Sequence, residues 1–370
     1  MSQFPESINN KMNIYPDTYS IFNVKPRDEN RTFGRIQQTL CIDSRDRNTK
    51  NYPNSNNYRL NLEKVYKDVI SIELTKAIIP QTGYIINHHN NKIHIQETNN
   101  ITVIISIPVG NYTITTFTTA LQNAINSAVT AGNLASTYTI SVNTTNNKIK
   151  LSSDLSGGDG IFKLIFADNS NKYPSGSMGY QIGFNQKNYL FAQGTVIADG
   201  TTILTGTNTN FSDILVAGDV VRIDGDASVY TISTVDSNTQ LTMTGAVTTT
   251  SGVSKNMILG AHVAPNFYNL TGDSYVLLHI DELERHDGVK NSIQNAFTTI
   301  PFPSQVGSVE YILNDKLGNS KDIRYFNPPF GKMDRLTISF RDYNNNLYDF
   351  NGRDHYLEFE VYMLNKQERY

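Results

Sequence analysis

The sequence predicts an all-β protein in which an antiparallel β-sandwich carries one helix and is interrupted by a small β-barrel. Apolar and polar residues alternate along most of the chain, whereas only one stretch repeats apolar residues every three to four positions. A third observation is a block rich in Thr, Val, Gly and Asp that separates two groups of strands. Alternation is typical of strands covered on one face, so most of the 370 residues are expected in antiparallel sheets.

Residues 1–38 show no sustained apolar period and contain Pro5, Pro16 and Pro26. A segment of this composition cannot bury enough apolar surface to form a core of its own. We therefore expect an extended N-terminal arm over residues 1–38.

Strands are expected from Tyr58 onward, where Leu60 and Leu62 share one face and Pro80 ends the run. Apolar alternation resumes after Asn-Asn turns and after breaks that contain glycine or proline. It predicts further strands near residues 93–95, 101–107, 138–142, 149–151 and 162–166.

One helix is expected between these strands, because Phe117, Leu121 and Ile125 recur at four-residue spacing in a stretch without glycine or proline. Thr113 or Thr115 is the expected N-terminal cap.

Residues 192–256 differ from both flanks, since they are nearly free of aromatic residues and lysine. Short apolar runs predict strands at 195–197, 202–204, 220–223, 229–232 and 241–243. Strands this short and this closely spaced favour a small closed barrel, because closure removes the exposed edges of a small sheet. We interpret residues 192–256 as an inserted barrel domain.

Strands resume after the insert, and the last one has the clearest pattern. Four apolar side chains face one way, Leu357, Phe359, Val361 and Met363, while Tyr356, Glu358, Glu360 and Tyr362 face the other. Strands are also expected near 276–280, 311–313 and 336–340. Residues 39–191 and 257–370 are therefore expected to form one sandwich that is continuous in space and divided in sequence.

Composition excludes several classes of protein. With 31 basic and 34 acidic residues the net charge is −3, which does not favour direct binding of nucleic acid. The single cysteine, Cys41, cannot form an internal disulfide, and no apolar run is long enough to predict a transmembrane segment or a secretion signal.

Candidate chemical sites are weak. The three histidines His88, His89 and His94 lack further residues at metal-ligand spacing. The polar segment that contains Asp281, Glu282, Glu284, His286 and Asp287 is interpreted as a solvated loop, and Asp224-Gly225-Asp226 lacks the rest of a calcium loop. No nucleophile or phosphate-binding motif is present, so no catalytic residue, cofactor or metal is predicted.

A dense alternation of charges precedes the first strand. Asp43, Arg45, Asp46 and Arg47 form either a solvated turn held by its own ion pairs or a contact between subunits. The second interpretation is favoured by the geometry of arginine, whose planar fork suits polar interfaces.

The order of several motifs resembles one known family. The segment IDSRDR at 42–47 is followed by Tyr52-Pro53-Asn54 and by a strand that ends at Ile79-Pro80. The motifs IPVGNYT, GYQIGF and YVLLHIDEL then follow at 107–113, 179–184 and 275–283. Over about residues 40–190 and 262–365 the chain resembles minor capsid or penton proteins of nucleocytoplasmic large DNA viruses, apart from the insert.

The resemblance implies a single jelly roll built into an icosahedral shell. We expect a non-enzymatic penton protein at the fivefold vertex that forms a homo-pentamer, contacts the major capsid protein and other minor capsid proteins, and assembles into the virion capsid in the host cytoplasm. An alternative is a minor capsid protein that cements the major capsomers. A third, from another class, is a glycan-binding attachment module, since jelly rolls and small barrels also serve as lectins.

Overall fold

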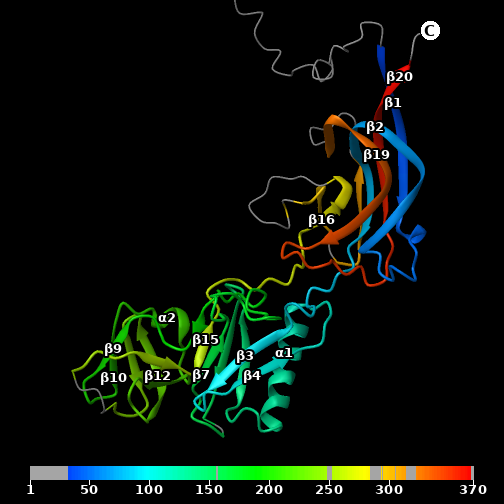
Figure 1. The fold of residues 1–370 in the computed structure, drawn as a ribbon. Helices are drawn as coiled ribbons and strands as arrows, with labels where there is room; N and C mark the ends of the chain where they lie inside the picture. The colour runs from blue at the N-terminus through cyan, green and yellow to red at the C-terminus, as the bar shows by residue number, and fades with distance from the viewer. Residues whose placement is uncertain are drawn as a thin grey trace, which may run out of the picture.

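The computed structural model describes residues 32–155, 157–247, 252–283, 293, 295–304, 306–313 and 322–367. Nearly all of its regular structure is antiparallel sheet, which confirms the all-β class. Figure 1 shows two bodies joined by two chain crossings, one near Pro80 and one before Tyr275. Residues 1–31 of the expected arm lie outside the described residues.

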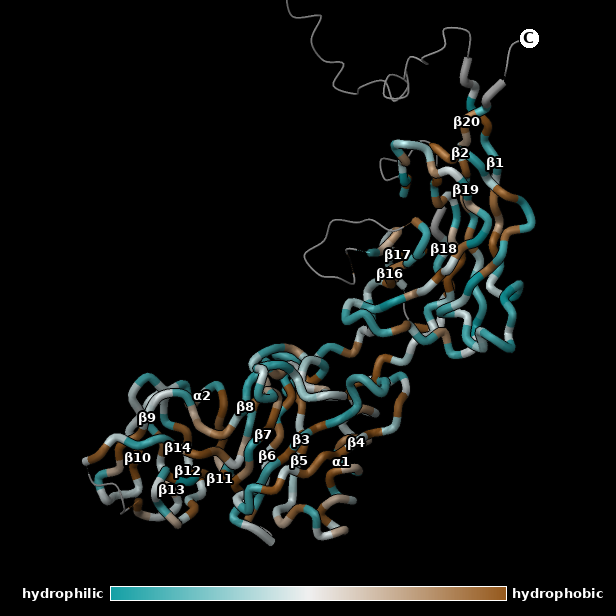
Figure 2. Tube along the Cα trace, in the orientation of Figure 1, coloured by the Kyte–Doolittle hydropathy of each residue, from teal (hydrophilic) through white to brown (hydrophobic). Residues whose placement is uncertain are grey.

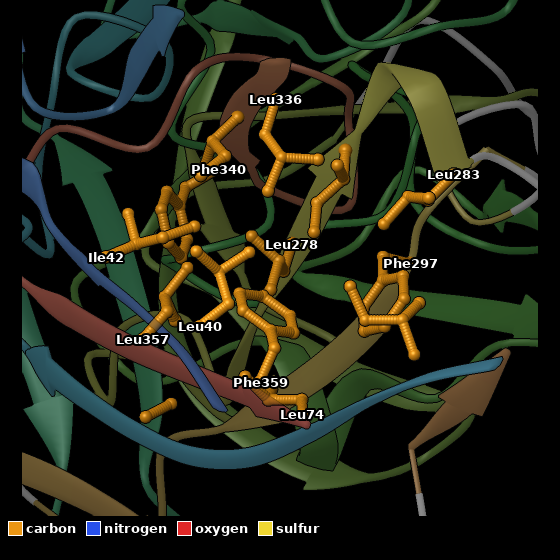
Figure 3. Packing of buried hydrophobic residues seen from close by; sticks show 14 of the residues in the cluster. Leu40, Ile42, Leu74, Leu278, Leu283, Phe297, Leu336, Phe340, Leu357 and Phe359 are labelled. Carbon is orange, nitrogen blue, oxygen red and sulfur yellow. The ribbon is translucent and has the colours of Figure 1, made fainter. Parts of the chain in front are cut away.

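The first body, here called the terminal lobe, is one seven-stranded sheet. Its strands lie in the order β1 (Thr32–Asp43), β20 (Tyr356–Gln367), β2 (Asn57–Pro80), β19 (Ile323–Arg341), β16 (Tyr275–Ile280) and β17 (Thr298–Pro301), and β18 (Val309–Leu313) also pairs with β2. Pairing of β2 with β19 shifts register twice, as bulges do, and both strands curve strongly (Figure 1). The curved sheet encloses a core in which Phe359, Leu74 and Leu278 meet (Figure 3).

The second body in Figure 1 consists of the inserted barrel and of a part here called the middle lobe, which contains two small sheets and the long helix. One sheet has the order β4 (Thr102–Ser106), β3 (Lys92–Glu97), β7 (Phe162–Ile165) and β8 (Asn188–Tyr189), and the other has β15 (Ala261–Val263), β6 (Lys148–Ser153) and β5 (Tyr138–Asn143). Helix α1 (Ile114–Thr130) packs against β4 and β5. These elements share a second core, separate from that of the terminal lobe.

Helix α1 confirms the predicted helix and one of its two proposed caps. Thr116 N–H donates to Thr113 Oγ1 at 3.3 Å, and Thr113 N–H donates to Thr116 Oγ1 at 2.9 Å. The helix buries Phe117, Leu121 and Ile125, as their spacing predicts.

The insert forms a nearly closed six-stranded barrel with its own core. The strand order is β14 (Met257–Leu259), β11 (Val220–Ile223), β12 (Val229–Ser237), β13 (Gln240–Met243), β10 (Ile203–Thr207) and β9 (Thr195–Ala198), with a one-turn helix α2 (Phe211–Ile214). Val196 and Lys255 exchange backbone hydrogen bonds of 2.8 and 2.9 Å, which join β9 to the segment before β14. Closure leaves no free sheet edge at this seam.

The structure differs from the sequence predictions in three places. Strand β1 begins at Thr32, so residues 32–38 belong to the sheet and not to an arm. The barrel includes β14, which lies beyond the predicted end at residue 256. The strands of 39–191 and 257–370 are divided between two cores (Figure 2), because the described strands between residues 92 and 263 pair with no strand of the terminal lobe.

The barrel and the middle lobe are in direct contact. Two ion pairs cross between them, Lys150 with Asp219 at 2.6 Å and Arg222 with Asp159 at 3.1 Å. Gly160, at φ +68°, lies against Val220, and a Cβ there would come within 2.8 Å of that side chain. Glycine therefore allows the two cores to approach closely.

Candidate assembly surface

A polar corner of the terminal lobe contains the four residues singled out from the sequence. It is built on the short helix η1 (Ser44–Asp46), which directly follows β1. Asp43 caps this turn, because its Oδ1 accepts from Arg45 N–H at 2.9 Å. Arg45 also donates from Nε and Nη2 to the same carboxylate, at 2.9 and 2.5 Å. These hydrogen bonds from Arg45 hold the pKa of Asp43 below its ordinary value.

Arg47 points into the corner, with only 9% of its side chain exposed, whereas Arg45 is 74% exposed. Its Nη1 donates to Asp354 Oδ1 at 2.5 Å and to the Ser44 carbonyl at 2.7 Å. Its other nitrogens donate to the carbonyls of Tyr52 and Pro53. Arg47 thus ties η1 to the loop before β2 and to the residue pair before β20.

Asp354 is the acceptor at the centre of this network. Its Oδ1 also accepts from Ser44 Oγ at 2.8 Å. Burial opposes ionisation of Asp354, but hydrogen bonds from Ser44 and Arg47 outweigh it, so its pKa lies below the ordinary value. The carboxylate is therefore ionised at neutral pH and pairs with Arg47.

Beneath the network lies a buried aromatic group. Tyr58 Oη and His355 Nε2 are 2.9 Å apart, and both residues are buried. The rings of Phe340 and Phe350 pack on the imidazole with centroids 4.5 and 5.3 Å away. Burial lowers the pKa of His355 to about 3, so its imidazole is neutral over the whole physiological range.

The structure brings the four predicted residues together but orients them differently. Arg45 and Asp46 are exposed, whereas Arg47 faces inward. The side chain of Asp43 caps the short helix η1. Their partners Asp354 and His355 were missed by the sequence reasoning, because pairing of β1 with β20 brings them to Ser44 and Arg47 across more than 300 residues of chain. In the sequence, these two residues stand out only as an Asp-His pair directly before the final strand.

Replacing Arg47 with alanine is expected to lower the free energy of unfolding of the terminal lobe by about 1 to 2 kcal/mol, because the carbonyls of Ser44, Tyr52 and Pro53 lose their donor and the exposed Asp354 loses its ion-pair partner. Urea denaturation measures this change. The matched variant Arg45→Ala removes an exposed arginine from the same turn and is expected to leave stability unchanged. Equal losses in the two variants would contradict the inward role of Arg47.

Next to the corner, the outer face of β20 carries alternating tyrosine and glutamate. Tyr362 Oη donates to Glu360 at 2.6 Å and Tyr356 Oη donates to Glu358 at 3.0 Å. Glu360 lies opposite the buried Glu73 of β2. We call Glu73, Tyr356, Glu358, Glu360 and Tyr362 the acidic face. The alternation of β20 predicted from the sequence is thereby confirmed.

Strand β1 forms the edge of the sheet beside the acidic face. Within the described part of the chain it pairs only with β20, along its whole length. Arg35, Gln37, Thr39 and Cys41 are exposed along it, and the Arg35 guanidinium lies 3.9 Å from the centre of the Tyr362 ring. A long open edge beside a polar face is suited to contact with another chain.

The other candidate sites have structural roles or lie outside the description. The described residues contain no group of three His, Cys, Asp or Glu side chains that could hold a metal. His94 is buried on β3, and burial lowers its pKa, whereas His88 and His89 are exposed. Asp226 accepts from Tyr230 Oη at 2.6 Å.

The acidic segment near residue 281 is only partly described. Asp281 and Glu282 lie in the short helix η2 (Asp281–Leu283), and Glu282 accepts from the backbone N–H and hydroxyl of Thr337 at 2.7 and 2.9 Å. Glu282 thus fastens η2 to β19. Glu284, His286 and Asp287 lie outside the described residues.

No helix in the described part of the chain has the length and apolar character needed to cross a membrane. The model of a family of unknown function, DUF5901, matches residues 34–257 and 185–367. No curated protein sequence matches the chain.

Two solved structures align with most of the chain at low similarity. The mavirus penton protein aligns with a TM-score of 0.37 and 8% identity, over 90% of this chain and 100% of that one. A chain of the Sputnik virophage aligns with a TM-score of 0.31 and 13% identity, over 89% and 98% respectively. Both TM-scores are below 0.5, so these alignments do not establish a shared fold.

Proposed function

We propose that this chain, which belongs to the DUF5901 family of unknown function, is a structural protein of a viral capsid and forms its fivefold vertex. The proposal starts from the ordered motifs over residues 40–190 and 262–365 that resemble penton and minor capsid proteins of large DNA viruses. It assigns the chain no catalytic role and places it in the virion capsid, assembled in the host cytoplasm beside the major capsid protein and other minor capsid proteins.

The open edge of β1 beside the acidic face is the observation that carries the proposal. A fivefold ring requires two different surfaces on each subunit, which meet head to tail and close after five copies. An edge strand with polar, partly exposed neighbours supplies one such surface. In the ring, this edge would be covered by the next copy.

Within this surface, Arg45 and Asp46 are the residues that we assign to direct contact with the neighbouring subunit. Both are exposed at the end of β1. Asp43 and Arg47 are assigned to the same contact indirectly, because they hold the turn that presents Arg45 and Asp46.

The purified chain is expected to form pentamers in native mass spectrometry and in light scattering at concentrations where shells assemble. The double charge reversal Arg45→Glu/Asp46→Lys is expected to shift the population toward monomer, since it places like charges against an unchanged partner surface. Lys172→Glu, an exposed change in the middle lobe, serves as the control and should leave the pentamer intact.

Monomers or dimers of the unmodified chain at those concentrations would contradict the penton role. If such monomers bound purified major capsid protein, the result would favour the cement protein instead. Pentamers that persist in the double reversal would refute the assignment of Arg45 and Asp46 while leaving the pentamer in place.

A further inference from the structure

A large cleft lies between the middle lobe and the barrel. Its volume is about 890 Å³, which is within the range of natural ligand sites. Sites of this kind occur preferentially where two folded units meet.

One wall of the cleft is the outer face of the β5–β6 hairpin. Alternation along β6 places Leu151 in the middle core and turns Lys148 and Lys150 toward the cleft. The register of the hairpin places Asn143 opposite Lys148 and Ser141 opposite Lys150, so the two strands present one polar face. This wall offers amide, hydroxyl and ammonium groups to a ligand.

The opposite wall comes from the barrel, at helix α2 and the loop that follows it. Asn210 and Ser212 line this wall. The side-chain oxygen of Asn210 is buried and accepts no hydrogen bond from the described part of the chain. Ser212 is exposed on this wall and presents its hydroxyl to the cleft.

The floor of the cleft is the extended segment that enters the barrel. Alternate residues along it, Lys187, Tyr189 and Phe191, all line the cleft. Lys187 Nζ lies 5.0 Å from the centre of the Tyr189 ring, and Phe191 is 47% exposed. Exposed aromatic surface beside polar groups suits a ligand with both C–H faces and hydroxyl edges.

The charge of the cleft selects an acidic ligand. Lys150 and Asp219 neutralise each other in a buried ion pair of 2.6 Å. Of the other lining residues, Lys148 and Lys187 carry positive charge and Asp213 carries negative charge. The cleft therefore has a net positive charge. Lys148 lies on the β5–β6 wall and Lys187 on the floor, so the two ammonium groups can bind a charged group from two directions.

We propose that this cleft binds an anionic oligosaccharide, whose acidic group lies between Lys148 and Lys187 and whose sugar ring packs on Phe191. The site needs both the barrel and the middle lobe, and it does not depend on the pentamer.

Isothermal titration of the full-length chain tests the proposal with four probes: 3′-sialyllactose, a heparin-derived tetrasaccharide, lactose and oligothymidylate. Saturable binding of one site per chain is expected for the carboxylated or the sulfated sugar, and the probe that binds identifies the acidic group. Lactose is expected to bind at least tenfold more weakly.

The variants Lys148→Gln/Lys187→Gln and Phe191→Ala are each expected to weaken binding at least tenfold with an unchanged melting temperature. The control Lys172→Gln removes an exposed lysine of the same lobe outside the cleft and should bind as the unmodified chain does. The proposal is overturned if neither acidic sugar binds, if the double variant binds normally, or if oligothymidylate binds as tightly as the sugars.

Discussion

Replacing Glu97 with alanine is expected to lower the free energy of unfolding of the middle lobe by about 3 to 5 kcal/mol. The carboxylate of this buried residue accepts from the N–H groups of Ala135 and Ser136 at 2.8 and 2.9 Å and from Tyr138 Oη at 2.8 Å. One side chain on β3 thus holds the segment that connects α1 to β5. Its removal leaves two buried donors, Ser136 N–H and Tyr138 Oη, and the part-buried N–H of Ala135 without this acceptor.

Urea denaturation measures the total loss, and hydrogen exchange locates it. The amides of Ala135 and Ser136 are expected to lose protection while the strands of the terminal lobe keep theirs, because the two cores are separate. Glu63→Ala, an exposed glutamate on β2, is the matched control and should leave stability unchanged. A Glu97 variant as stable as this control would show that the three hydrogen bonds contribute little.

Acidification from pH 6.5 to 4 is expected to remove roughly 3 kcal/mol of stability through His355 alone. Burial lowers the pKa of this imidazole to about 3, whereas in the unfolded chain it binds a proton near pH 6.5. Between these values the unfolded state holds one more proton than the folded state, so the free energy of unfolding falls as the pH falls. The contribution is complete above pH 6.5 and is lost progressively toward pH 3.

The contribution of His355 is isolated by measuring the free energy of unfolding against pH for the unmodified chain and for His355→Gln. All other titrating groups are the same in both proteins. Those groups include His262, whose pKa burial lowers to about 4, and Asp273, whose pKa burial raises to about 6 and which acts in the opposite direction. The gap in stability between the two proteins should narrow by about 1.4 kcal/mol per pH unit between pH 6 and 4.5. Parallel profiles would rule out a neutral buried imidazole.

His89→Gln provides the control for that comparison. His89 is exposed in the turn after Ile86, away from both cores. The same measurement on this variant separates the loss of the buried imidazole from the loss of any histidine.

Local patterns were sufficient to predict most individual elements. The alternation of β20, the cap and buried face of α1, and the short strands of the barrel each depend on residues close together in the chain, and each is present in the structure. For the polar corner, the sequence predicted the cluster of charges but not the orientation of its side chains. The charges of residues 43–47 were visible, but whether an arginine faces solvent or a carboxylate depended on Asp354, far away in the sequence.

By itself, the sequence determined the all-β class, the single long helix and the separate character of the insert, because alternation, helical spacing and composition are properties of neighbouring residues. Only the tertiary structure decided which strands share a core, that β1 starts at Thr32, that Arg47 is buried, and that Lys148 and Lys187 face one cleft. The physical reason is that alternation shows that a strand has a covered face and does not identify the strand that pairs with it. Pairing was settled by long-range contacts such as those of β1 with β20.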